Sequence, residues 1–427
     1  MPEIPVLASL DSSLALLTDP YRFLSSSSER MGSDIFETRL LLQRTICLRG
    51  DQWAQFFYES PQLTRQGAVP KLVKQVLFGQ GGVQGLEGER HRRRKALFLS
   101  IMSPERIAEL VDLVAEIFDR YALRWAIQEK VVLYEEFRSL LTEAVCHWAG
   151  VGLAIEEVDE RSRQLAALYE ESASIGLGHF RGRAARRSCE EWVSSQLAEI
   201  RSGRREVCAH SAAFIFAMGE EPDGSLIDLQ VATDDLLSVL RPTVAVSLFL
   251  TFAAHALHAF PRAREGLIDG DPQSLLSFAQ EVRRYYPFFP MTAAIVREPI
   301  DVMGYHLPRG RRVLLDLYGT NHHPRIWDDP QQFQPHRFDH WVPNPNTLVP
   351  QGGGHQETNH RCVGEALTIE LLKLVADRLV NSMSYDVPPQ DLEPDIRRVP
   401  AMIPSGLEIT AVRLTPSIPL EPAAVRS

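Results

Sequence analysis

The sequence predicts a mainly α-helical protein with a minor, segregated β-sheet, an α+β class in which one long helix crosses the interior. Three observations predict this class. Ser103 followed by Pro104 is a helix N-cap with proline at the first helical position. An apolar stretch with helical periodicity extends from about residue 226 to 260. Short segments that favour strands are confined to the C-terminal part of the chain.

The predicted helices follow one another through the first two thirds of the chain. The helix that begins after Ser103 is expected to end near residue 128, and helical periodicity continues through 130–150, 155–175 and 188–201. The long apolar stretch would span about 50 Å as a single helix, enough to cross a whole domain. Pro261 closes it, and a further helix is predicted over 273–286, ahead of Pro287.

The predicted strands come after this last helix. We expect strands at 294–297, 300–306 and 311–315, with Pro308-Arg309-Gly310 as a turn before the third. A final sheet is expected near 383–413. Because the strands follow the helices instead of alternating with them, the sheet should be segregated from the helical core.

Composition excludes several classes of function. The 427 residues contain no linker or repeat, so we expect one domain over 1–427 with a disordered tail at 418–427. The net charge of -10 argues against nucleic acid as a partner. Five cysteines without regular spacing do not suggest a disulfide framework, which predicts a cytoplasmic location.

The sequence also predicts no stable membrane anchor. Residues 1–20 lack both a basic start and a long apolar core, so they match neither a secretory signal nor an anchor. The most apolar segment, 244–257, contains polar side chains and is shorter than a membrane-spanning helix requires.

Cys362 is the most informative residue of the chain. It lies in the run Asn-His-Arg-Cys-Val-Gly-Glu over 359–365, in which the cysteine is followed by glycine two residues later and then by an amphipathic helix. A thiolate in this setting can serve as the axial ligand of a haem. A free cysteine is more often a small buried apolar residue, so this motif needs support from elsewhere in the sequence.

That support comes from a carboxylate and two guanidinium groups. Glu281 and Arg284 are three residues apart on one helical face. About fifty residues later, Arg337 lies in the run Phe-Gln-Pro-His-Arg-Phe over 333–338, which we expect to be extended. The three side chains can form one planar, multiply hydrogen-bonded cluster.

With these motifs in this order, the chain resembles the cytochrome P-450 superfamily from about residue 10 to about residue 414. The resemblance implies a cytochrome P-450 fold with the long central helix over a haem b (iron protoporphyrin IX), to which Cys362 is the sole protein ligand. One departure is notable. Most members have phenylalanine, glycine and arginine where this chain has His355, Thr358 and His360, and its glycines lie upstream at 352–354, so the ligand loop should be longer than usual.

The pair Arg241-Pro242 in the long helix indicates which branch of the superfamily the chain resembles. The usual oxygen-activating members carry a glycine and an acid-alcohol pair at this part of the helix, and neither is present here. A charge in an apolar helix needs an anion, and Asp235 and Asp234, six and seven residues earlier, are beyond the spacing of an ordinary helical ion pair. An Arg-Pro pair resembles the peroxygenase branch, enzymes that oxidise long-chain fatty acids with hydrogen peroxide.

The resemblance to this branch implies a mechanism and a set of partners. Arg241 would bind the substrate carboxylate in a bidentate fork beside Pro242, and that carboxylate would serve as the acid-base group. The predicted reaction is hydroxylation at the α and/or β carbon, because only these carbons would lie near the iron. Peroxide supplies both oxygen and electrons, so no redox protein partner would be required.

The remaining site residues follow from the same resemblance. Phe78 and Gln84 would face the substrate from a loop that covers the haem, and Phe288 would be an apolar wall of the pocket. His91 and Lys95, with Arg65, would hold the haem propionates.

Four alternatives stay open at this point. Within the same fold they are a monooxygenase that depends on redox partners and an oxidative decarboxylase that forms terminal alkenes. From another class, the chain could be a haem or fatty-acid carrier without turnover. His355, His360 and Cys362 could also ligate zinc, although no paired Cys-x-x-Cys or His-x-x-x-His accompanies them, and no nucleotide-binding glycine motif occurs.

Overall fold

The structure is a computed structural model that describes residues 3–79 and 82–415, with the backbone but not the side chain of Gln84. The tail predicted at 418–427 lies outside these residues. The helices are α1 (Ser13–Thr18), α2 (Phe23–Met31), α3 (Asp51–Glu59), α4 (Lys71–Leu77), α5 (Gly88–Ile101), α6 (Pro104–Trp125), α7 (Leu133–Ala149), α8 (Val158–Glu170), α9 (Leu177–Arg201), α10 (Ala212–Ala217), α11 (Leu229–Ala259), α12 (Pro261–Glu265), α13 (Pro272–Tyr285), α14 (Leu317–Asn321) and α15 (Glu365–Asp377). The strands are β1 (Ile35–Leu40), β2 (Gln43–Leu48), β3 (Leu63–Thr64), β4 (Val131–Val132), β5 (Met291–Val296), β6 (Ile300–Val302), β7 (Tyr305–Leu307), β8 (Arg312–Asp316), β9 (Met383–Asp386) and β10 (Glu408–Leu414).

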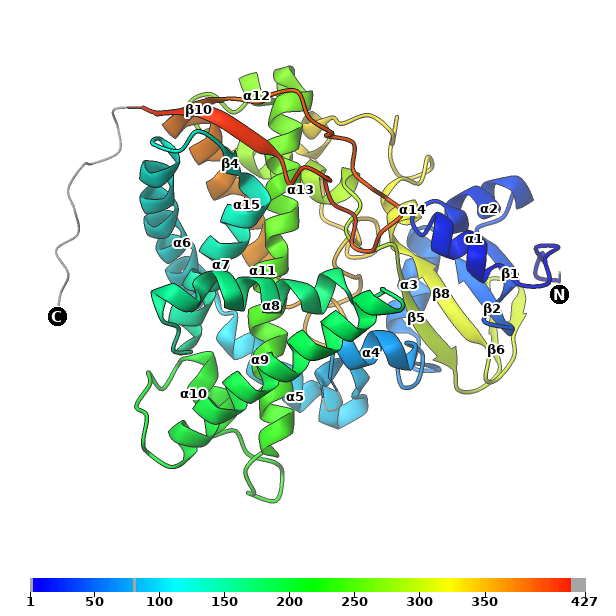
Figure 1. Ribbon diagram of the computed structural model, residues 1–427. Helices are drawn as coiled ribbons and strands as arrows, with labels where there is room; N and C mark the ends of the chain where they lie inside the picture. Colours follow the sequence, from blue (N-terminus) through cyan, green and yellow to red (C-terminus); the bar gives the residue numbers. More distant parts are fainter. Residues whose placement is uncertain (1–2, 80–81, 416–427) are drawn as a thin grey trace.

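The helices and the main sheet occupy different sides of the molecule. Figure 1 shows α11 running through the middle, with α6, α7 and α15 on one side and the sheet that contains β1, β2, β5 and β8 on the other, while α8 and α9 cross α11. The largest hydrophobic cluster of the described residues joins α11 to α7, α8, α9 and α15. The predicted α+β class with a segregated sheet is therefore confirmed.

The long central helix is also confirmed. α11 spans 31 residues, and the side chain of Asp228 caps its first turn by accepting hydrogen bonds from the N–H groups of Gln230 and Val231. The helix continues through Pro242 without interruption. By length and composition α11 could cross a membrane, with a mean hydropathy of 1.8, but 89 % of that apolar window is buried inside the protein. Core packing accounts for its apolar sequence.

The main sheet draws on strands that are far apart in the sequence. Among the described residues its order is β1-β2-β8-β5-β3, with β2 and β8 parallel and the other neighbours antiparallel. The hairpin β1-β2 was missed from the sequence. Its turn holds Leu41 and Leu42 at positive φ, without the glycine or asparagine that marks such turns.

Two predicted boundaries were wrong. The strand expected at 300–306 is a hairpin, β6-β7, because Met303 and Gly304 turn the chain at positive φ. The helix expected at 188–201 is α9, which begins eleven residues earlier. The sequence pattern missed this part because Gly178 and Gly182 lower the helix propensity there. A Cβ on Gly182 would lie 2.8 Å from Val76, so the close packing of α9 on α4 explains that glycine.

Candidate active site

Cys362 lies in the loop that leads into α15, two residues before the N-cap Gly364. Its N–H donates to the Gln351 carbonyl at 3.0 Å, and the Gln351 amide nitrogen lies 3.9 Å from Sγ. Burial raises the pKa of the thiol, while the backbone N–H of Gly364 and the charges of Arg283 and Lys95 oppose that rise. These groups offset part of the cost of ionising a buried thiol, which must be a thiolate when it ligates a haem.

The glycines before the cysteine are required by close packing. Gly352 has a φ of +94°, and a Cβ there would lie 3.2 Å from the carbonyl oxygen of His360. A Cβ on Gly354, at a φ of +75°, would lie 2.9 Å from Tyr58. The loop is therefore folded back tightly against α3, which explains why the glycines stand at 352–354.

A cluster of charged residues anchors this loop, and the sequence analysis missed it. Arg283 of α13 and Arg361 both bind the carboxylate of Glu365 at the start of α15. Burial would raise the pKa of Glu365, but the two guanidinium groups lower it below its ordinary value. The only sequence signal was a glutamate three residues after the cysteine.

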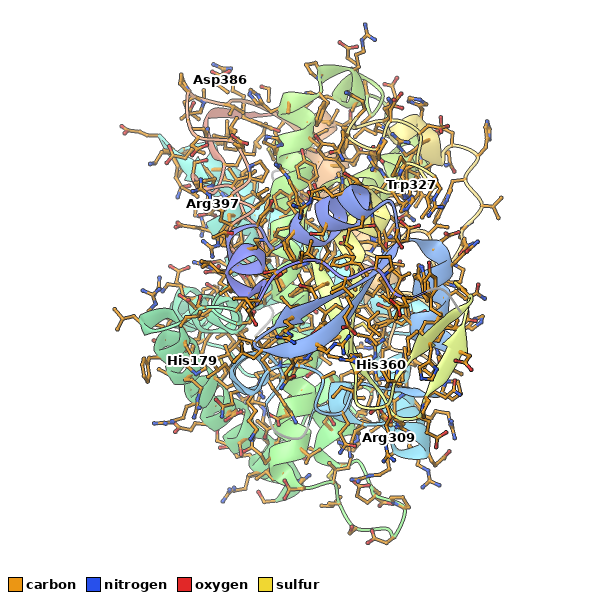
Figure 2. The ribbon with its side chains drawn as sticks, turned by 90° about the vertical axis from the view of Figure 1, so that its right-hand side faces the viewer. His179, Arg309, Trp327, His360, Asp386 and Arg397 are labelled. Carbon is orange, nitrogen blue, oxygen red and sulfur yellow. The ribbon has the colours of Figure 1, made fainter. Side chains whose placement is uncertain are left out.

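The predicted cluster of Glu281, Arg284 and Arg337 is confirmed. Nε and Nη2 of Arg284 each donate to Glu281 at 2.7 Å, and Arg337 binds the same carboxylate at 3.2 Å. Arg284 also lies over Trp327, which is labelled in Figure 2. Arg337 was expected on an extended stretch, but it lies in a short 3₁₀ turn over Pro335–Phe338. Proline at the first position of that turn is compatible with helical geometry.

The three basic residues predicted to hold the propionates are all close to the ligand loop or the adjoining sheet. Nζ of Lys95 donates to the backbone carbonyls of Asn359 and Arg361. The His91 ring lies 4.3 Å from the ring of His360, which Figure 2 labels. Arg65 lies over Phe57 at 4.0 Å and donates to the Ala293 carbonyl at 3.0 Å.

Burial modifies the charges of these groups. It lowers the pKa of His91 to about 4 and that of Lys95 to about 8, although the charge of Cys362 raises the pKa of Lys95. His91 is therefore a neutral imidazole near pH 7, able to donate one N–H. Arg65 and Lys95 supply the positive charge.

Arg241 is buried in the middle of α11. Arg241 is 6 % exposed, and its Nη1 has no hydrogen-bond partner among the described residues. The guanidinium carbon lies 5.7 Å from the ring centroid of Phe78, at the end of α4. The pKa of Arg241 is lowered to about 9, mainly by burial and also by the charge of Arg186, while the charges of Asp234 and Cys362 oppose this change.

The two aspartates of α11 are bound to other arginines. Asp234 pairs with Arg186 of α9, and Asp235 pairs with Arg94 of α5. All four residues are buried. Helices other than α11 therefore supply an arginine partner to each aspartate.

The predicted apolar wall has a defined partner. The Phe288 ring stacks on Phe249 of α11 at 4.4 Å, with an angle of 28° between the rings. The hydroxyl of Tyr21 donates to the Phe288 carbonyl at 2.7 Å. Gln84 lies in a 3₁₀ turn over Val83–Gly85, and its side chain is outside the described part of the structure.

These residues fit a haem-thiolate site. Cys362 supplies a sulfur at the start of α15, and Arg65 and Lys95 place positive charge beside the same loop. The charge of Cys362 acts on both Lys95 and Arg241, so these groups share one region. Within residues 3–79 and 82–415 no group of three or more His, Cys, Asp or Glu side chains could hold a metal ion, so the zinc alternative has no support there.

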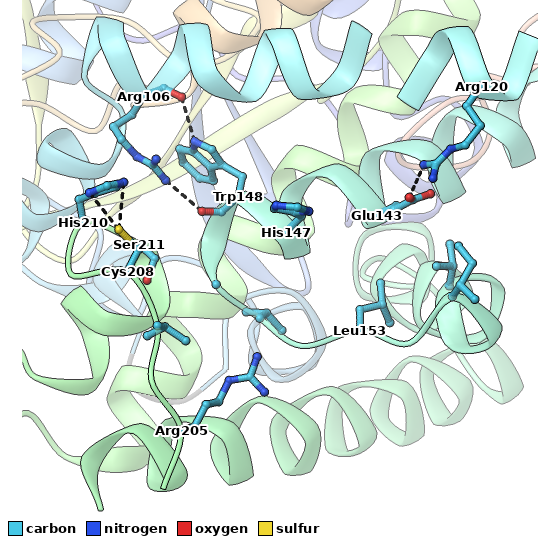
Figure 3. Close-up of a pocket in the computed structure, with 15 residues that line it drawn as sticks. Arg106, Arg120, Glu143, His147, Trp148, Leu153, Arg205, Cys208, His210 and Ser211 are labelled. Atoms are coloured by element: carbon cyan, nitrogen blue, oxygen red, sulfur yellow. Dashed lines mark hydrogen bonds and ion pairs between the residues drawn. The ribbon is translucent and has the colours of Figure 1, made fainter. Parts of the chain in front are cut away.

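A cavity of about 620 Å³ lies apart from this candidate haem site, between α6, α7 and the segment before α10. Figure 3 shows Arg106, His147, Arg205 and Cys208 on its walls. It contains none of the predicted site residues.

Comparisons with known proteins identify the family. The cytochrome P450 family model matches residues 275–410. Curated relatives include a putative cytochrome P450 137 of Mycobacterium tuberculosis, 22 % identical over 80 % of this chain and 74 % of its own, and cytochrome P450 716A1 of Arabidopsis thaliana, 24 % identical over 87 % and 81 %.

Solved structures are more similar. Cytochrome P450EX alpha (CYP152N1) with myristic acid is 40 % identical, with a TM-score of 0.93 over 96 % of this chain and 99 % of that one. Cytochrome P450SP alpha (CYP152B1) in complex with (R)-ibuprophen is 41 % identical, with a TM-score of 0.92 over 95 % and 100 %. Ligand-free cytochrome P450 OleT is 32 % identical, with a TM-score of 0.94 over 96 % and 99 %. The chain therefore belongs to the cytochrome P450 superfamily, in the fatty-acid-oxidising CYP152 branch, and is a haem-thiolate protein.

Proposed function

We propose that this protein hydroxylates long-chain fatty acids at the α and/or β carbon with hydrogen peroxide as the oxidant. The observation that carries this proposal is Arg241, a buried guanidinium in the helix that faces the haem site, with Nη1 unpaired among the described residues. A buried guanidinium with an unsatisfied donor is costly, and a substrate carboxylate would supply an acceptor for Nη1.

Arg241 is suited to a carboxylate because its planar guanidinium can donate two parallel hydrogen bonds. Phe78 lies over the guanidinium and would shield the ion pair from water. Pro242 has no N–H, so the Ser238 carbonyl one turn earlier lacks its helical donor. This irregularity lies beside Arg241, where the polar head of the substrate would enter.

Proton transfer would depend on the substrate. The only carboxylates within α11 are Asp234 and Asp235, and both are bound to arginines. The Thr243 hydroxyl donates to the Val239 carbonyl at 2.9 Å, so it is engaged as well. A fatty-acid carboxylate held by Arg241 can accept a proton from one peroxide oxygen and return it to the other as the bond between them breaks. The products are one hydroxy fatty acid and one water.

The haem, bound through Cys362, supplies the oxidation chemistry when present. Arg65 and Lys95 would hold its propionates as cations, and His91 would donate a neutral hydrogen bond. Arg241 would fix the carboxylate, so the α and β carbons come closest to the reaction centre. Phe78, Gln84 and Phe288 would line the path of the chain. Because peroxide carries both oxygen and electrons, no redox protein partner would be needed.

The test is a product analysis of the haem-loaded protein with myristate. With peroxide alone we expect 2- and 3-hydroxymyristate, whereas reduced nicotinamide with a reductase and ferredoxin should give no more than a background rate. Methyl myristate, which has no carboxylate, should be a poor substrate. Turnover that requires the reductase system would identify a conventional monooxygenase, and no turnover with either system would favour a carrier.

A further inference from the structure

The proposed substrate site lies beside a buried ion pair that joins α9 to α11. Arg186 on α9 is 3 % exposed, and Asp234 on α11 is fully buried. Nη2 of Arg186 binds Oδ1 of Asp234, and its Nε donates to Glu190 at 2.6 Å. Apart from burial, the charges that act most on the pKa of Arg241 are those of Arg186 and Asp234. The pair is therefore close to the residue that would hold the substrate.

Asp234 is well placed to compete for Arg241. The two residues are seven apart, which is about two helical turns, so they lie on the same face of α11. The axial separation is about 10 Å, and a helical side chain leans toward the N-terminus, which brings the Arg241 guanidinium toward Asp234. If Arg186 were absent, Arg241 would be a cation on the same face of α11 with which the buried carboxylate of Asp234 could pair.

The other buried arginines near the N-terminal half of α11 are fully engaged by carboxylates. Arg94 binds Asp235 and Glu221, and Arg186 binds Asp234 and Glu190. Arg241, in contrast, keeps Nη1 without a hydrogen-bond partner among the described residues. A fatty-acid carboxylate would supply that acceptor.

The backbone after Phe78 fixes the position of the pair. Gly79 has a φ of +75°, and a Cβ there would lie 2.2 Å from Nη2 of Arg186 and 2.3 Å from Oδ1 of Asp234. Only glycine fits between this backbone and the ion pair. The Arg186–Asp234 pair is thus held against the same segment that carries Phe78.

We propose that Arg186 holds Asp234 away from Arg241 and so keeps Arg241 available to bind a fatty-acid carboxylate. This inference rests on the proposed function, because it concerns the affinity of the same substrate site. Arg186 is a positioning residue: it acts on the substrate through Asp234 and Arg241.

The test is calorimetric titration of the haem-loaded protein with myristate in the absence of peroxide. In Arg186→Leu, we expect the dissociation constant for myristate to rise by about tenfold or more, because Asp234 then pairs with Arg241. Affinity for methyl myristate should not change. In the double variant Arg186→Leu/Asp234→Asn, myristate affinity should return to near that of the unmodified protein. That rescue separates competition by Asp234 from a loss of packing.

Two further variants keep the inference testable. Arg181→Leu removes an exposed ion pair with Glu171 from the same helix and should leave myristate affinity unchanged. Asp234→Asn alone should bind myristate at least as tightly as the unmodified protein, even if Arg186→Leu fails to fold. Unchanged affinity in Arg186→Leu, no rescue in the double variant, or weaker binding in Asp234→Asn would overturn the inference. No myristate binding by the unmodified protein would instead overturn the proposed function.

Discussion

The guanidinium of Arg241 lies 5.7 Å from the ring centroid of Phe78, so the end of α4 covers the one buried arginine of α11. An arginine over an aromatic face is stabilised by the ring, but the ring offers no hydrogen-bond acceptor for Nη1. The cation–π contact therefore stabilises the position of Arg241 and leaves Nη1 available to a ligand. This arrangement is what the mechanism proposed above requires.

Replacement of the cysteine should remove the thiolate signature. In Cys362→Ala the reduced protein with carbon monoxide should lose the strongly red-shifted absorbance band that thiolate-ligated haem produces, because the axial sulfur is gone. Cys208→Ala is the matched control, since Cys208 is exposed and free, and its band should be normal. A retained red-shifted band in Cys362→Ala would refute the assignment of the ligand.

The thiolate should also make haem binding depend on pH. Burial raises the pKa of Cys362, while the haem-bound sulfur must stay ionised. Haem binding to the thiol form therefore releases a proton. Affinity should rise with pH and fall as pH falls below the raised thiol pKa, by up to about tenfold per unit. The rate of haem transfer to excess apomyoglobin between pH 5.5 and 8 measures this pH dependence, and the transfer should be faster at acidic pH. A slower transfer at the acidic end would contradict the prediction.

Arg241→Ala should lose far more turnover than a binding defect explains. The substitution removes both the carboxylate anchor and the position of the acid-base group, so peroxide-driven turnover of myristate should fall by about 100-fold or more. Arg241→Lys should also be impaired, because an ammonium cannot form the bidentate fork. Single-turnover rates at saturating myristate separate the two effects. Normal fatty-acid oxidation by Arg241→Ala would disprove the mechanism.

Gln84 should influence the choice between hydroxylation and decarboxylation. A neutral amide cannot act as an acid near neutral pH, whereas a histidine can donate a proton. We therefore expect 2- and 3-hydroxy fatty acids as the main products and a larger share of terminal alkene from Gln84→His. Gas chromatography of the products measures the ratio. If alkene dominates in the unmodified protein, the function is decarboxylation, with the roles of Cys362 and Arg241 retained.

The Glu281 cluster should be a major contributor to stability. Glu281→Gln leaves the buried guanidinium of Arg284 without its carboxylate, and breaking a buried ion pair in this way costs about 3–5 kcal/mol. Thermal unfolding of the haem-loaded protein should show a clearly lower midpoint. Glu89→Gln, which breaks exposed pairs with Arg92 and Arg93, is the control and should not shift it. Equal midpoints for Glu281→Gln and the unmodified protein would show that the cluster is dispensable.

Much of this site could be predicted because its evidence is local in the sequence. Glu281 and Arg284 are three residues apart on one helix, and Cys362 directly precedes the N-terminus of another. Arg241 was identified from a charge inside an apolar helix. In each case the neighbouring residues define the setting, so a one-dimensional pattern carries the information.

Other features depend on elements that only folding brings together. The parallel pairing of β2 with β8 joins Cys47 to Leu314, and no local pattern specifies a partner at that distance. His91 is part of a basic run in the sequence, yet burial against the ligand loop lowers its pKa and makes it neutral.

By itself, the sequence determined the family, a candidate haem ligand and the presence of an unusual arginine in the central helix, because these depend on residue identity and short spacing. The tertiary structure alone decided which charged side chains pair with one another. Asp234 and Asp235 belong to the same helix as Arg241, but α9 and α5 bring Arg186 and Arg94 to them. Ion pairing in a buried region follows distance in space, and that distance exists only after the helices have packed.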